Sequence, residues 1–121
     1  MDESLRIALV QTELKWEDPA ANRDLFTEKI NQIDTQVNLI VLPEMFTTGF
    51  TMHPERIDVG EGARTLEWMK TLASKKQAAI TGSIVFTDNG TYYNRLFFVF
   101  PRGNHVTYDK RHTFTLAGEH K

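Results

Sequence analysis

Apolar residues recur in short runs along the chain, and each run is bounded by polar or turn-forming residues. Runs of this length and composition predict β-strands, because buried strands are short and rich in branched and aromatic residues. Several runs are apolar at consecutive positions, which favours strands that are covered on both faces. The pattern predicts five strands, at Leu5–Val10, Asn38–Leu42, Ala78–Phe86, Tyr92–Phe100 and His105–Tyr108.

Two intervening segments repeat their apolar residues every three or four positions, which is the period of a helix. The first begins at Asp18, a good N-cap residue, and Pro19 follows at a position where its missing N–H costs nothing. The second spans Thr65–Lys76 and ends in two lysines, where the helix dipole favours cations. The predicted apolar faces are Phe26, Ile30, Ile33 and Val37 in the first helix, and Leu66, Met69, Leu72 and Ala73 in the second.

The order of these elements predicts an α/β fold with a mixed β-sheet. The first two strands flank a helix, so they are expected to be parallel. Asp88–Gly90 predicts a tight hairpin between the third and fourth strands, because Asn and Gly tolerate positive φ. The glycines and the proline of Glu44–Ala63 predict a segment that is mostly loop.

The end of the chain predicts an incomplete domain. Thr115–Lys121 has the pattern of neither a capped helix nor a terminal strand, and is typical of a loop interrupted partway. Two helices can barely cover one face of a sheet whose strands favour burial on both. We therefore expect residues 1–121 to be a fragment of a longer domain, or to be completed by a partner.

The charge balance excludes several classes of partner. The 121 residues carry 14 Lys and Arg against 16 Asp and Glu, so no basic surface for nucleic acid or an anionic membrane is expected. The acidic N-terminus lacks the pattern of a signal peptide, and no apolar run could cross a bilayer, so a cytoplasmic location is expected. The chain has no cysteine, and its 4 histidines lack metal-ligand spacing, so neither a metal nor another cofactor is expected.

Glu44 is the first candidate for chemistry. It lies just after a predicted parallel strand, at the edge of an α/β sheet where ligands bind. Its neighbours Leu42, Met45, Phe46 and Phe50 are apolar, so burial is expected to raise its pKa toward the range of a general base. The alternative is a solvated loop glutamate or one paired with an arginine.

Lys110 is the second candidate. It follows the last predicted strand, in the segment Tyr108–His112, and a lysine held there could stabilise an oxyanion. The alternative is a solvated basic cluster at the end of a strand. If both candidates belong to one site, the side chains of Glu44 and Lys110 should lie within ion-pairing distance.

Three segments together resemble the nitrilase superfamily of carbon–nitrogen hydrolases. They are Ile7–Thr12, Leu42–Phe46 and Tyr108–His112, and their order and spacing fit along nearly the whole chain. The sequences Pro-Glu-Met-Phe-Thr-Thr-Gly-Phe and Ala-Gly-Glu-His look closest to the omega-amidase branch. The resemblance implies that residues 1–121 are the N-terminal portion of a carbon–nitrogen hydrolase domain. It also implies part of an α-β-β-α sandwich and a homodimer or larger homo-oligomer.

The resemblance also implies a Glu–Lys–Cys triad. Matching the motifs makes Glu44 the general base, Lys110 the cation and Glu119 a supporting carboxylate. The family's nucleophilic cysteine lies further along than this chain extends, so the chain alone is expected to be inactive. The implied substrate is a small amide, such as an omega-amide of a 2-oxo or dicarboxylic acid, which is hydrolysed with release of ammonia. The alternative is a catalytically inactive homologue that acts as a binding or assembly module.

Overall fold

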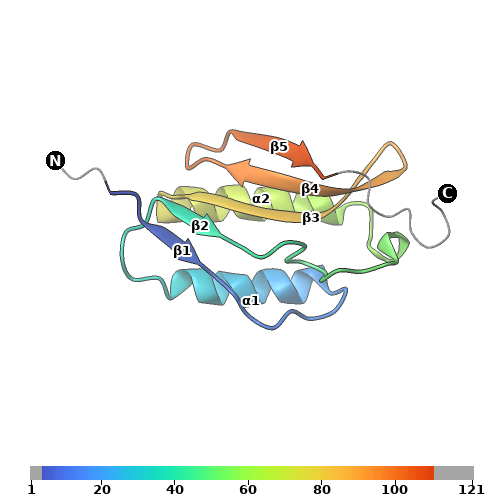
Figure 1. Cartoon of the computed structure of the whole chain (residues 1–121), viewed down its shortest axis with the longest axis horizontal. Coiled ribbons are helices and arrows are strands. Elements are labelled where there is room, and N and C mark those ends of the chain that lie inside the picture. Colours follow the sequence, from blue (N-terminus) through green and yellow to red (C-terminus); the bar gives the residue numbers. More distant parts are fainter. Residues whose placement is uncertain (1–3, 111–121) are drawn as a thin grey trace.

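The computed structural model describes residues 4–110, which form one mixed five-stranded sheet (Figure 1). The strands lie side by side in the order β1-β2-β3-β4-β5. The first three are mutually parallel, and β4 and β5 join them as antiparallel neighbours. This confirms the predicted α/β class and the mixed sheet. The strands are β1 (Ile7–Leu9), β2 (Leu39–Val41), β3 (Ala79–Asp88), β4 (Thr91–Val99) and β5 (His105–Asp109).

Both predicted helices are present, with shifted ends. Helix α1 (Pro19–Asn31) begins as predicted, with the Asp18 side chain accepting a hydrogen bond from the Ala21 N–H. It ends before Ile33 and Val37, which pack on the core from the following connection. The polar residues between them favour a turn over another helical turn.

Helix α2 (Glu61–Lys76) begins one turn earlier than predicted. Gly62 in a helix interior argued against this earlier start, but packing requires a glycine at that position. A β-carbon there would lie only 2.5 Å from the ring of Phe86 on β3. The preceding loop is mostly irregular as expected, apart from the short 3-10 helix η1 (Pro54–Arg56). The hairpin between β3 and β4 is confirmed, with positive φ at Asn89 and Gly90.

The core lies between the two helices and one face of the sheet. Alternation along the strands, together with the pairing of Ile40 with Ile80, places both isoleucines on this face. Figure 1 shows α1 and α2 running alongside the sheet. The largest fully buried apolar side chains of this layer are Phe26, Phe46, Phe97, Ile30, Ile40, Met69, Ile80, Ile84 and Val99.

The opposite face of the sheet is apolar and partly exposed. Ile7 and Leu9 on β1 and Val106 and Tyr108 on β5 all point to this side, and each is about half exposed or more. The expectation that the first strand is buried is therefore wrong for residues 4–110. The physical reason is that α1 and α2 pack on the other face and that β1 lies at the edge of the described sheet.

Candidate active site

Glu44 lies in a tight turn just beyond the carboxyl end of β2. Pro43 ends the strand because it has no N–H to donate. The two N–H groups after Glu44 both bind Ser83 on β3: Met45 donates to its hydroxyl Oγ at 3.0 Å, and Phe46 donates to its carbonyl at 3.1 Å. Ser83 thereby holds the turn against the neighbouring strand.

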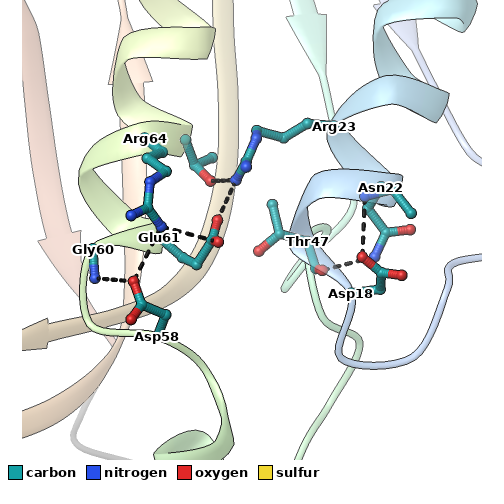
Figure 2. Close-up of polar contacts among 10 residues, drawn as sticks. Asp18, Asn22, Arg23, Thr47, Asp58, Gly60, Glu61 and Arg64 are labelled. Atoms are coloured by element: carbon teal, nitrogen blue, oxygen red, sulfur yellow. Dashed lines mark hydrogen bonds and ion pairs between the residues drawn. The ribbon is translucent and has the colours of Figure 1, made fainter.

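The same turn is fixed on its other side by the two helices. The fully buried Phe46 ring packs edge-to-face on Phe26 of α1 and against Trp68 of α2. The buried Asn22 side chain donates to the Thr47 carbonyl at 2.7 Å (Figure 2). These contacts make Glu44 part of a rigid scaffold, although its segment has no regular secondary structure.

Lys110 directly follows β5 and is held by β4. Its N–H donates to the carbonyl of Asn94 at 2.9 Å. The preceding residue, Asp109, accepts two hydrogen bonds from the guanidinium of Arg95, at 2.6 and 3.0 Å. That guanidinium also lies 4.6 Å from the centre of the Phe86 ring. Asn94 and Arg95, which are neighbours on β4, therefore fix the end of β5 and the position of Lys110.

The structure brings the two candidate residues together. Lys110 Nζ lies 2.6 Å from Glu44 Oε2, across a separation of 66 residues in the chain. This confirms the predicted proximity of the two side chains. The pair is partly open to solvent, with 38% of the Glu44 side chain and 46% of the Lys110 side chain exposed.

The pKa of Glu44 is lowered, which corrects the expectation that burial would raise it. The main cause is the hydrogen bond from Lys110, and a second hydrogen bond from Asn94 acts in the same direction. Burial opposes these effects, but the half-exposed carboxylate retains much of its hydration. Glu44 is therefore a carboxylate at neutral pH.

Two cavities open beside the ion pair. The larger, of about 390 Å³, lies on the exposed face of the sheet and is lined by Thr81, Ser83, Leu96 and Tyr108 among others. The smaller, of about 310 Å³, lies against the turn and is lined by Met45, Phe50, Thr51, Met52 and Asn94. Glu44 and Lys110 line both, so a small molecule in either cavity could reach the charged pair.

Sequence reasoning missed Asn94. Its Nδ2 donates to Glu44 Oε2 at 2.9 Å, and only 5% of the residue is exposed. An asparagine inside a strand is unfavourable by β-propensity, and this was the available signal. Glu119, the third predicted site residue, lies outside the described residues, so its proposed role stays a prediction.

Neither a metal site nor a membrane span is found in the described part of the chain. Residues 4–110 contain no cluster of three or more His, Cys, Asp and Glu side chains that could hold a metal ion. None of the helices in that range is long and apolar enough to cross a membrane.

Comparison with known families shows the family to which this chain belongs. The family model for carbon-nitrogen hydrolases matches residues 6–121. The chain belongs to the carbon–nitrogen hydrolase family. This carbon–nitrogen hydrolase chain is 38% identical over 120 residues to omega-amidase YafV of Yersinia enterocolitica, a match that covers 97% of this chain and 45% of the relative. It is 28% identical to 2-oxoglutaramate amidase of Bacillus subtilis strain 168, covering 94% of this chain and 45% of that relative.

Solved structures show the same fold. A CN-hydrolase superfamily protein from Xanthomonas campestris, with an arsenic adduct in its active site, matches with a TM-score of 0.83 and 39% identity. That match covers 95% of this chain and 43% of the other. An amidase from Nesterenkonia sp. AN1, captured after addition of acrylamide at its active-site cysteine, matches with a TM-score of 0.78 at 19% identity and covers 88% of this chain and 44% of the other. This chain therefore spans less than half the length of the curated relatives that it matches.

Proposed function

We propose that this chain supplies the general base and the oxyanion-stabilising cation of an amidohydrolase that releases ammonia from a small omega-amide. The observation that carries the proposal is the 2.6 Å contact between Lys110 Nζ and Glu44 Oε2 beside two open cavities. The similarity to omega-amidase YafV and 2-oxoglutaramate amidase supports an omega-amide of a 2-oxo or dicarboxylic acid as the substrate class.

The proposed reaction begins with a cysteine thiol that this chain does not contain. The Glu44 carboxylate takes the proton of the thiol, and the thiolate sulfur bonds to the carbonyl carbon of the amide. The carbonyl oxygen becomes an oxyanion, which the ammonium group of Lys110 stabilises. Because the lowered pKa keeps Glu44 ionised, it is ready to accept this proton at neutral pH.

The second half of the proposed reaction reverses the proton transfer. Protonated Glu44 gives its proton to the amide nitrogen, the carbon–nitrogen bond breaks, and ammonia leaves. Water then attacks the thioester while Glu44 takes one of its protons. The thiolate departs, recovers the proton, and leaves the carboxylic acid product. In this scheme Glu119 would support the charged groups, as the family resemblance implies.

A hybrid enzyme tests the proposal. In it, this chain replaces the matched part of omega-amidase YafV of Yersinia enterocolitica, and the rest of that relative would have to supply the cysteine that the scheme requires. We expect ammonia release from 2-oxoglutaramate by the hybrid, and none by the 121-residue chain alone. A hybrid that is as stable as the parent relative but releases no ammonia from 2-oxo or dicarboxylic omega-amides would overturn the proposal.

A further inference from the structure

Asn94 occupies a place in β4 that packing alone does not explain. It lies in the middle of the strand, on the face away from the helices, and only 5% of the residue is exposed. Its Nδ2 donates to Glu44 Oε2, but its Oδ1 is buried and has no hydrogen-bond partner among residues 4–110. An unpaired buried acceptor destabilises a fold, and leucine would fill the same space without one.

The hydrogen bonds around Glu44 are distributed unequally between its two oxygens. Oε2 accepts from both Lys110 Nζ, at 2.6 Å, and Asn94 Nδ2, at 2.9 Å. No described residue donates to Oε1. Because a carboxylate oxygen that already accepts two donors is a poor proton acceptor, Oε1 is the more basic oxygen in this geometry.

We propose that Asn94 is a positioning residue, which holds Oε2 of Glu44 so that Oε1 is the oxygen that exchanges the proton with sulfur and nitrogen. The catalytic part of this inference rests on the proposed function. Asn94 also accepts the N–H of Lys110 through its own carbonyl, so one residue of a regular strand binds both members of the ion pair. A rigid strand suits this task because proton transfer depends on closely defined geometry.

The first test uses the 121-residue chain and needs no activity. The carboxyl carbon of Glu44 is followed by carbon-13 NMR as the pH is varied, with its signal assigned by its loss in Glu44→Gln. In Asn94→Leu we expect the pKa of Glu44 to rise, because one of its two hydrogen bonds is lost. We also expect an unchanged or higher melting temperature, because a buried acceptor that has no partner in the described part of the chain is removed as well.

Two further variants make this test decisive. Asn94→Asp keeps the shape of the side chain but places a carboxyl group beside Glu44, so it should raise the pKa of Glu44 further than leucine does. Tyr92→Phe, two residues along the same face of β4, is the matched control and should leave the titration unchanged. The proposal is overturned if Glu44 titrates identically in wild type, Asn94→Leu and Asn94→Asp.

The second test uses the hybrid enzyme. There we expect Asn94→Leu to lower kcat by about 10- to 100-fold, with little change in KM, and to shift the acidic limb of the pH profile upward. A purely structural role would instead lower the melting temperature and leave the limb in place. If the NMR titration shifts but the wild-type hybrid is inactive, the positioning contact stands and the proposed function fails. If the hybrid is active and Asn94→Leu matches it, the positioning role fails alone.

Discussion

Two ion pairs of nearly equal length occupy opposite kinds of environment in this molecule. Arg23 of α1 and Glu61 of α2 meet at 2.7 Å between the helices, with 14% and 19% of their side chains exposed (Figure 2). Glu44 and Lys110 meet at 2.6 Å on the exposed side of the sheet, between two cavities, and 38% and 46% of their side chains are exposed.

The pairs also differ in how their carboxylates are satisfied. Glu61 accepts from Arg23 through one oxygen and from Arg64 through the other, at 2.7 and 3.1 Å. Within residues 4–110, Glu44 has two side-chain donors, and both of them bind Oε2. A carboxylate with a donor on each oxygen is suited to joining helices, whereas one with a free oxygen beside a cavity is suited to chemistry. Distance alone therefore does not distinguish a structural pair from the pair that we propose to be catalytic.

The largest effect is expected from removing the base. In the hybrid enzyme, Glu44→Gln should lower kcat about 1,000-fold, because the amide cannot accept the thiol proton. Ammonia release measures the loss. The matched change in the other pair, Glu61→Gln, should keep activity within about twofold of wild type wherever the hybrid remains folded. Equal losses in the two variants would remove the functional distinction between the pairs.

The second-largest effect is expected from removing the cation. Lys110→Met in the hybrid enzyme should lower kcat about 100-fold, because the oxyanion loses a preorganised positive charge. In the 121-residue chain the same change should raise the pKa of Glu44, since Lys110 provides the main effect that lowers it. Carbon-13 titration of Glu44 checks this shift. An unchanged pKa would show that the pair does not persist in solution.

A smaller effect, on stability alone, is expected from breaking the ion pair between Arg23 and Glu61. Glu61→Gln should lower the free energy of unfolding by about 1–2 kcal/mol, because Arg23 and Arg64 lose a partly buried charged partner. Urea denaturation measures the change. Asp58→Asn is the control, because its contact with Arg64 is mostly exposed and should contribute much less to stability. Similar losses in both variants would contradict the buried role of Glu61.

The smallest expected effect is the pH dependence of the folding stability that the ion pair between Glu44 and Lys110 contributes. The pKa of Glu44 in the folded chain lies below its ordinary value of 4.5, so the pair stabilises the fold above that pH. This contribution falls as the pH drops through the folded pKa. Because both side chains are well exposed, it should be under about 1 kcal/mol. The stabilities of wild type and Glu44→Gln, measured by urea denaturation, should therefore differ at pH 7 and converge as the pH falls through the folded pKa of Glu44. A difference that grows on acidification would contradict the pairing.

Local sequence patterns predicted much of the two helices and of the hairpin between β3 and β4. The N-cap at Asp18, the buried faces of both helices and the turn at Asn89 and Gly90 follow from residues near one another in the chain. The start of α2 was missed because it depends on Gly62 lying against Phe86, a contact between distant residues. The sequence also predicted that the side chains of Glu44 and Lys110 would meet, through a family resemblance in addition to strand-end positions.

The sequence by itself determined the type and order of the elements, because periodicity, capping and turn preferences act over a few residues. Only the tertiary structure decided the state of the site. The pKa of Glu44 depends on Lys110 and on Asn94, which lie 66 and 50 residues away in the chain. Short-range patterns predicted burial and a raised pKa for Glu44. Instead, the pairing of β4 with β5 brings hydrogen-bond donors to the carboxylate, and these donors lower its pKa. Electrostatics depends on distance in space, and the fold alone determines that distance.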